Sequence, residues 1–92
     1  MPTIHVPSAM RTLTKGAAEI EVEAETVRDA LIELDRIHPG LALKVLDAAG
    51  SVKPFIRIYV GPEDIQSLHG LDTKLGERDE MSIIPAIAGG HA

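Results

Sequence analysis

One amphipathic helix, set between runs of alternating residues, limits most strongly what this chain can fold into. After Thr26, apolar residues recur at helical spacing, and charged residues fill the positions between them. Thr26 is a suitable N-cap residue, Asp29 stands three positions later, and Pro39-Gly40 ends the pattern. The apolar face consists of Val27, Ala30, Leu31, Leu34 and Ile37. We therefore expect one main helix between Thr26 and Pro39.

Two runs before this helix predict a β-hairpin. Residues Thr3 to Val6 alternate between polar and apolar side chains, and Ala18 to Glu23 alternate again, with the glutamates on the solvent side. The intervening Thr14-Lys15-Gly16 is typical of a turn. The chain is therefore expected to start with two paired strands.

Three further strand segments follow the helix. Lys53–Val60 is the clearest, Glu63–Ile65 can form only a short edge piece after Gly61-Pro62, and Met81–Ile87 closes the fold. A short extra turn of helix is expected over Leu41–Leu46. Three leucines are expected to seal the end of the core: Leu68, Leu71 and Leu75.

The two faces of the Lys53–Val60 strand differ in chemistry. Its aliphatic set, which should face the helix, is Ile56, Ile58 and Val60, and its other set is Phe55, Arg57 and Tyr59. Both aromatic residues of the protein then lie on the solvent side of the sheet. With Ile84 from the last strand, this second set forms a candidate docking patch for a partner protein. The alternative is ordinary cross-strand pairing that stabilises the sheet.

The order of these elements predicts an α+β fold. A hairpin, one main crossover helix and later strands form two layers, with the helix packed across one face of a mixed sheet of four to five strands. The first and last strands are the most uniformly aliphatic, which favours central positions. We expect a β-grasp domain over residues 1–87 and a flexible C-terminal tail over residues 88–92.

Composition excludes several classes of function. The 92 residues carry a net charge of −5, so neither nucleic acid nor an anionic membrane is an expected partner, and basic partners fit better. The chain contains no cysteine, which excludes disulfides and thiolate chemistry. No targeting or membrane-spanning segment is evident, so we expect a cytoplasmic protein. Four histidines lack ligand spacing, and we expect no metal site: His5, His38, His69 and His91.

The C-terminal stretch is unusual because the predicted last strand leads directly into Ala88-Gly89-Gly90. Two glycines without Cβ atoms form a thin, extendable arm that can enter a narrow slot. The alternative is a frayed chain end, where small residues are common. Whether the arm is functional depends on the domain that presents it.

The segments in their order resemble the ubiquitin-like sulfur-carrier family, which includes the small subunit of molybdopterin synthase and the thiamine-pathway carrier. The resemblance is closest to the carrier that feeds cysteine synthesis in actinobacteria. It covers nearly the whole chain and rests above all on the run from Asp79 to Gly90. Further segments carry it: Arg11, Thr26, Phe55 to Val60, Glu63 to Ile65, and Gly70 to Thr73.

The resemblance implies a carrier that is not itself an enzyme. An ATP-binding partner, related to ubiquitin-activating enzymes, adenylates the terminal glycine carboxylate, and sulfide or a persulfide then displaces AMP to leave a thiocarboxylate. This points to Gly90 as the sulfur-carrying residue, with Ala88 and Gly89 as the tail. It also implies that Arg11 lies near the exit of the tail and helps it dock, with a solvated arginine as the alternative.

Two residues, His91 and Ala92, follow the second glycine, where the simple family pattern ends. Some family members carry such extensions and are matured by a JAMM-type zinc protease. We therefore expect cleavage between Gly90 and His91. No cofactor is expected on this chain itself, since ATP and zinc belong to the partner enzymes.

Several roles remain compatible with this sequence. The first is sulfur delivery to a cysteine-synthase-like enzyme by a carrier that is monomeric when free. The others are a small subunit of molybdopterin synthase, a ubiquitin-like modifier joined to lysines through Gly90, and a plain interaction domain.

Overall fold

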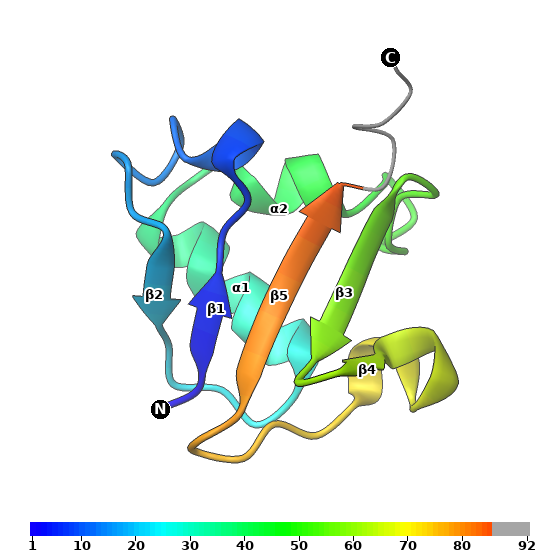
Figure 1. Ribbon diagram of the computed structural model, residues 1–92. Coiled ribbons are helices and arrows are strands. Elements are labelled where there is room, and N and C mark those ends of the chain that lie inside the picture. Colours follow the sequence, from blue (N-terminus) through cyan, green and yellow to red (C-terminus); the bar gives the residue numbers. More distant parts are fainter. Residues whose placement is uncertain (86–92) are drawn as a thin grey trace.

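The structure is a computed structural model that describes residues 1–85. Five strands and two helices make up the fold (Figure 1): β1 (Thr3–His5), β2 (Glu19–Glu21), α1 (Val27–Ile37), α2 (Leu41–Val45), β3 (Ile56–Val60), β4 (Glu63–Asp64) and β5 (Glu80–Pro85). Three short 3-10 segments join them: Ser8–Met10, Ile65–Ser67 and Gly70–Asp72. The predicted hairpin, main helix, second helix and edge strand are confirmed.

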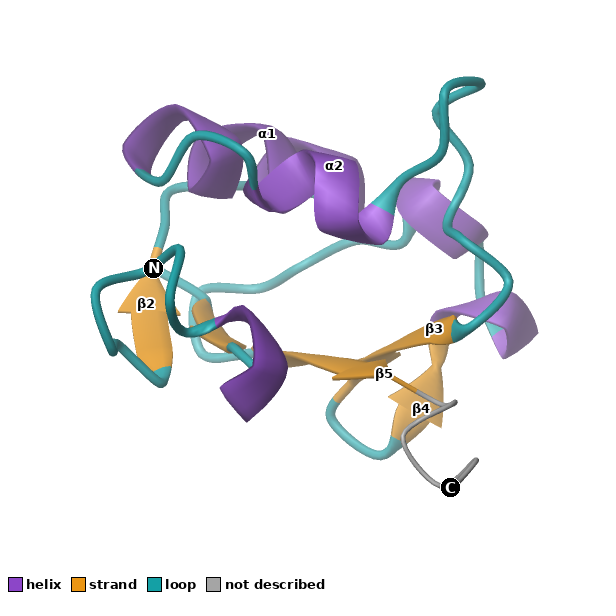
Figure 2. Ribbon diagram, turned by 90° about the horizontal axis from the view of Figure 1, so that it is seen from above, coloured by secondary structure: helices purple, strands orange, loops and turns teal. Residues whose placement is uncertain are grey.

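The strands form one mixed sheet in the order β2-β1-β5-β3-β4. β1 pairs with β5 in parallel, and the other three pairings are antiparallel. The prediction that the first and last strands occupy the interior of the sheet is therefore confirmed, with β5 at its centre. Both helices lie on one face of this sheet (Figure 2), which confirms the expected two-layer α+β arrangement.

Helix α1 begins where its cap predicts. The Thr26 side-chain oxygen accepts a hydrogen bond from the Asp29 backbone N–H at 3.1 Å, which satisfies one of the donors left open in the first turn. Four residues of the predicted apolar face are buried: Val27, Ala30, Leu31 and Leu34. Ile37, in contrast, is 42% exposed. At 3.6 residues per turn it lies about 70° from the centre of the buried stripe, at its margin.

The core lies between the helices and the inner face of the sheet. Its fully buried side chains include Ile4 from β1, Ile58 from β3 and Met81 from β5. Leu75 is buried and Leu71 packs partly against the core, as predicted.

The prediction for Leu68 is wrong, because this side chain is exposed at the surface. The 3-10 segment that precedes it already buries Ile65 in this part of the core. The chain then leaves the helical path at Leu68, with φ −111° and ψ −119°.

Two predicted strands are shorter in the structure. β2 spans only Glu19–Glu21, although the Val6 backbone N–H donates to the Ala18 carbonyl at 2.8 Å and continues the pairing beyond it. β3 starts at Ile56 because its N–H donates to the Lys53 carbonyl at 3.0 Å and closes a turn. Residues 86 and 87 of the predicted last strand lie outside the described residues. Among residues 1–85, no helix has the length and apolar character needed to cross a membrane.

Candidate functional site

The predicted site has two parts, and the structure describes one of them. The tail residues Ala88, Gly89, Gly90 and His91 lie outside the described residues. The proposed boundary between domain and tail lies there as well. What the structure shows is the end of the sheet from which the tail continues, together with the predicted docking residues around it.

The outer face of the sheet brings two predicted docking residues side by side. Arg57 on β3 pairs directly with Ile84 on β5, and both side chains point away from the helices. Ile84 is 43% exposed, which is unusual for an isoleucine in a central strand. Tyr59 pairs with Ser82 further along the same face and is half-buried.

Phe55 lies at the same end of the sheet but outside the strand. It occupies the turn just before Ile56, and Ile56 pairs with Pro85, the last described residue. Phe55 is 58% exposed. The prediction that it belongs to the strand is therefore wrong, whereas its exposure agrees with the expectation. The structure thus groups Phe55, Arg57 and Ile84 around the end of β5.

Arg11 reaches this end from the other side of β5. Its Nε donates to the Val6 carbonyl at 3.0 Å, which holds the guanidinium over the end of β1. Arg11 also lines a shallow hollow with Pro7, Ile84 and Pro85. Arg11 thus lies near Pro85, the last described residue, and its role in docking stays a prediction.

A buried hydroxyl group stabilises the loop that carries Arg11. Thr14 is 1% exposed, and its hydroxyl lies 3.2 Å from the Arg11 carbonyl and 2.8 Å from the Ala17 carbonyl. Met10, just before Arg11, is also buried. The loop is therefore anchored on both sides of the arginine.

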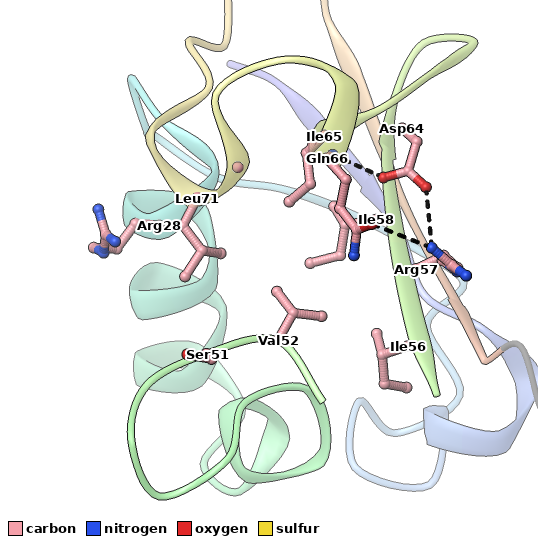
Figure 3. A pocket seen from close by; sticks show the side chains of 11 residues that line it. Arg28, Ser51, Val52, Ile56, Arg57, Ile58, Asp64, Ile65, Gln66 and Leu71 are labelled. Carbon is pink, nitrogen blue, oxygen red and sulfur yellow. Dashed lines mark hydrogen bonds and ion pairs between the residues drawn. The ribbon is translucent and has the colours of Figure 1, made fainter. Parts of the chain in front are cut away.

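Arg57 makes only long polar contacts within the described residues. Its guanidinium lies 3.7 Å from Asp64 Oδ2 and 3.4 Å from Gln66 Oε1 (Figure 3). A pocket of about 240 Å³ lies beside β3, and its lining includes Ile56 and Ile58 of this strand and Arg28 of α1. Apolar side chains point into it, among them Val52, Ile65 and Leu71.

A cluster of polar side chains across the first strand was not predicted from the sequence. His5 Nε2 lies 2.6 Å from Glu80 Oε1, and His5 Nδ1 lies 3.7 Å from Glu19 Oε2. His5 stands opposite Glu19 in the β1–β2 pairing. The predicted hairpin did not specify this register, and the neighbour on β5 depends on the parallel pairing of β1 with β5. Among the described residues, no group of three or more acidic or histidine side chains is placed to hold a metal ion.

Two side chains with shifted pKa values, Glu33 and Arg36, lie on α1, away from the outer face of the sheet. On the solvent side of α1, the Arg36 guanidinium donates to both carboxylate oxygens of Glu33, at 3.1 and 3.2 Å from Nε. This hydrogen bonding lowers the pKa of Glu33 and raises the pKa of Arg36. The pair lies on the helix layer, so it does not set the charge of the outer sheet face.

The chain is similar to known proteins over nearly its whole length. The model of the ThiS family matches residues 4–90. The chain is 34% identical to a putative sulfur carrier protein of Archaeoglobus fulgidus over 86% of this chain and 90% of that protein. It is 29% identical to the sulfur carrier protein CysO of Mycobacterium tuberculosis over 96% of this chain and 97% of that protein.

A solved structure gives the same result for the fold. A chain in the crystal structure of the BexX/CysO complex from Amycolatopsis orientalis superposes with a TM-score of 0.92 and 29% identity. The match covers 98% of this chain and 100% of that one. The predicted β-grasp fold is therefore confirmed.

Proposed function

Because the chain belongs to the ThiS family of ubiquitin-like sulfur carriers, we propose that it carries its sulfur as a thiocarboxylate on Gly90. The sulfur is then donated in the synthesis of cysteine or a related sulfur amino acid. The observation that carries this proposal is the extent of the family match, which runs to Gly90 and leaves out His91 and Ala92. The part of the chain shared with the family thus ends at the second glycine.

The chemistry needs an activated carboxyl group. A carboxylate is a poor electrophile, so a partner enzyme joins the Gly90 carboxylate oxygen to the α-phosphorus of ATP and releases pyrophosphate. Sulfide sulfur then attacks the carbonyl carbon of the acyl adenylate, and AMP leaves with the electron pair of the broken C–O bond. The chain is the substrate in both steps. Glycines at positions 89 and 90 place no Cβ atoms near the reacting carbon.

Processing precedes activation in this scheme. While His91 follows it, Gly90 has a peptide carbonyl and no carboxylate. A JAMM-type zinc protease adds water across the Gly90–His91 peptide bond and releases the dipeptide. An uncut chain should then be inert as a sulfur acceptor.

The outer sheet face supports docking of the adenylating enzyme. Arg57 pairs with the exposed Ile84, and Tyr59 continues the same face. Phe55 is exposed in the turn just before β3. Arg11 stands on the other side of the end of β5. A related carrier chain occurs in a complex with BexX. We propose that the outer sheet face of this protein binds the adenylating partner, and that a cysteine-synthase-like enzyme later accepts the sulfur.

Intact mass spectrometry of the protein from its native host tests this function. The expected pool has lost His91-Ala92 and has one carboxylate oxygen replaced by sulfur. A uniformly full-length, unmodified pool would contradict the proposal. Higher-mass adducts that disappear when Gly90 is removed would show protein conjugation in place of sulfur transfer.

A matched pair of chains tests the order of steps. One ends at Gly90 and the other retains His91-Ala92, and both are incubated with the adenylating enzyme, ATP and sulfide. Only the shorter chain should form the thiocarboxylate. Equal conversion of both chains would remove the need for processing.

A further inference from the structure

The pocket beside β3 reaches the edge of the sheet. Three consecutive residues of the strand line it: Ile56, Arg57 and Ile58. Successive side chains of a strand point to opposite faces, so a pocket on one face should be lined by every second residue. The Arg57 side chain indeed points away from the pocket (Figure 3), and Arg57 therefore contributes its backbone. The wall of the pocket on this side is thus the backbone edge of β3.

This edge of β3 has a strand partner over only part of its length (Figure 1). β4 pairs with only the last two residues of β3 and ends at Asp64. The Asp64 side chain then accepts a hydrogen bond from the Gln66 backbone N–H at 2.8 Å, which turns the chain into a 3-10 segment. Within residues 1–85, Ile56 and Arg57 have no strand beside them on this side. A strand edge without a partner can pair with an added extended segment.

The backbone of Ile56 is turned toward this edge. In an antiparallel pair, hydrogen-bonded positions alternate along the strand. The Gly61 N–H donates to the Glu80 carbonyl of β5 at 2.8 Å, so Arg57 bonds to β5 as well and Ile56 faces the other way. The Ile56 N–H donates to the Lys53 carbonyl at 3.0 Å, whereas the Ile56 carbonyl accepts no hydrogen bond from a turn or loop of residues 1–85. This carbonyl can therefore accept one from an added segment.

The interior of the pocket suits one apolar side chain. Apolar side chains point into it from several parts of the chain (Figure 3): Val52, Ile56, Ile58, Ile65 and Leu71. Its volume of about 240 Å³ is below the range of about 300–1,000 Å³ that is usual for small-molecule sites. A single leucine, isoleucine or methionine side chain fits this size better than a drug-sized ligand. Pocket and strand edge therefore indicate the same occupant, an extended peptide segment.

Alternation along an added strand then determines the order of its side chains. The residue beside Arg57 places its side chain on the outer face, and its two neighbours point to the side of the pocket. Arg57 is exposed, and its guanidinium lies 3.7 Å from the carboxylate of Asp64. A carboxylate of the added strand can form a closer pair with it, because opposite charges on neighbouring strands attract. The matching segment is therefore apolar, acidic and apolar in order.

Segments of this chain itself do not suit the pocket. The residues after Pro85 include no acid. The strand segment Ile20-Glu21-Val22 has the right order of side chains, but Val22 is 1% exposed and belongs to the core of its own molecule. A second copy paired around Arg57 would bring two guanidinium groups together, which is unfavourable. The occupant is therefore another protein.

We propose that the free edge of β3 and the adjoining pocket form a docking site for an extended segment of a partner protein with the order apolar, acidic, apolar. The segment donates a backbone N–H to the Ile56 carbonyl, places its acid beside Arg57 and inserts one apolar side chain into the pocket. The site lies on the edge of β3 opposite β5. Its use does not depend on the chemistry proposed for Gly90.

Titration of the full-length chain with a short peptide tests the site. The probe is a blocked peptide with leucine-aspartate-leucine at its centre and glycine and serine elsewhere, and amide NMR spectra of the labelled protein follow its binding. Chemical shifts should change most at Val52, Ile56 and Gln66, and little in β2. No change at millimolar peptide, or changes centred on another part of the protein, would overturn the proposal.

Three changes to the probe separate the contacts without altering the protein. Alanine in place of both leucines should weaken binding about tenfold or more, because the pocket stays empty. Lysine in place of aspartate should weaken it about fivefold. Methylation of the central backbone nitrogens removes the N–H that reaches the Ile56 carbonyl and should weaken binding about tenfold. If any of these peptides binds as tightly as the parent probe, the proposed mode of docking is wrong.

A charge swap tests the role of Arg57 in the protein. Arg57→Glu should reverse the preference, so that the lysine peptide binds more tightly than the aspartate peptide. The matched control is Lys74→Glu, an equal change in charge at an exposed residue that pairs with Thr26 at the start of α1. It should keep the parent preference. Equal changes in both variants would overturn the placement of the acid beside Arg57, and dispersed amide spectra confirm that both variants fold.

Discussion

The two faces of the sheet carry the same residue types for different purposes. On the inner face, Ile58 and Ile83 pair across β3 and β5, and both are buried. One step along each strand, Arg57 and Ile84 pair on the outer face and remain exposed. Isoleucine on one side stabilises the fold by leaving water, and isoleucine on the other side is available to a partner. Neighbouring residues of one strand can thus be assigned to stability and to binding by exposure alone.

The largest expected effect compares two isoleucines. Ile58→Ala should lower the free energy of unfolding by about 2–5 kcal/mol, because the site is fully buried and the substitution leaves a cavity. Ile84→Ala should change it by less than about 0.5 kcal/mol. Urea denaturation measures both values. A loss for Ile84→Ala as large as that for Ile58→Ala would break the division between the faces.

A smaller loss of stability is expected at Thr14, whose buried hydroxyl holds the loop that carries Arg11. Thr14→Val removes a buried hydroxyl that bonds two carbonyl groups, and it should cost about 1–3 kcal/mol. It also loosens the loop that holds Arg11, so kcat/KM for tail cleavage should fall as well. Thr14→Ser keeps the hydroxyl and should preserve the cleavage rate. If both variants cleave equally well, Arg11 does not depend on this anchor.

Removing the charge of Arg57 on the outer face should have little effect on stability. Arg57→Ala removes contacts of 3.7 and 3.4 Å at an exposed position, so unfolding free energy should change by less than about 0.5 kcal/mol. Binding to the adenylating enzyme should nevertheless weaken severalfold, as measured by isothermal titration calorimetry. A variant that loses stability but keeps its affinity would reassign Arg57 to the fold.

The smallest expected effect is on the pH dependence of stability. It involves Glu33 and Arg36 on α1, which belong to neither face of the sheet. Arg36 lowers the pKa of Glu33 in the folded protein, so this pair stabilises the fold above the carboxyl group's unfolded pKa. The contribution is lost as the pH falls through the lowered folded value. Glu33→Gln should therefore flatten the dependence of the thermal midpoint on pH only slightly, and only in the acid range. The parent should therefore be slightly more stable than the variant at neutral pH, and this difference should shrink as the pH falls. A difference that grows in acid would contradict the prediction.

Local patterns in the sequence predicted most of the fold. The Thr26 cap, the α1 stripe and the alternation in β3 depend on spacing within one segment, and the structure agrees with them. Leu68 was predicted to be buried and is exposed, and Ile37 is more exposed than the rest of the apolar face of α1. The burial of both residues depends on where an element ends relative to the rest of the molecule. No local pattern contains that information.

The candidate site was likewise predictable only where local patterns decide it. The exposure of Ile84 agrees with alternation along β5, whereas Phe55 is exposed in a turn outside the predicted strand. The grouping of Arg11 with Pro85 needed the parallel contact between β1 and β5. The contact of His5 with Glu80 could not be predicted from local patterns, because it depends on which strands are neighbours. The tail chemistry came from family resemblance and from no feature of residues 1–85.

The parallel pairing of β1 with β5 also limits when the sheet can form during synthesis. β1 is synthesised first, yet its inner neighbour in the sheet is the last strand to be made. Contacts between residues this distant in sequence slow folding and make it cooperative. The sheet cannot close while β5 is still inside the ribosome. The outer face that β3 and β5 form together is therefore complete only after β5 has emerged.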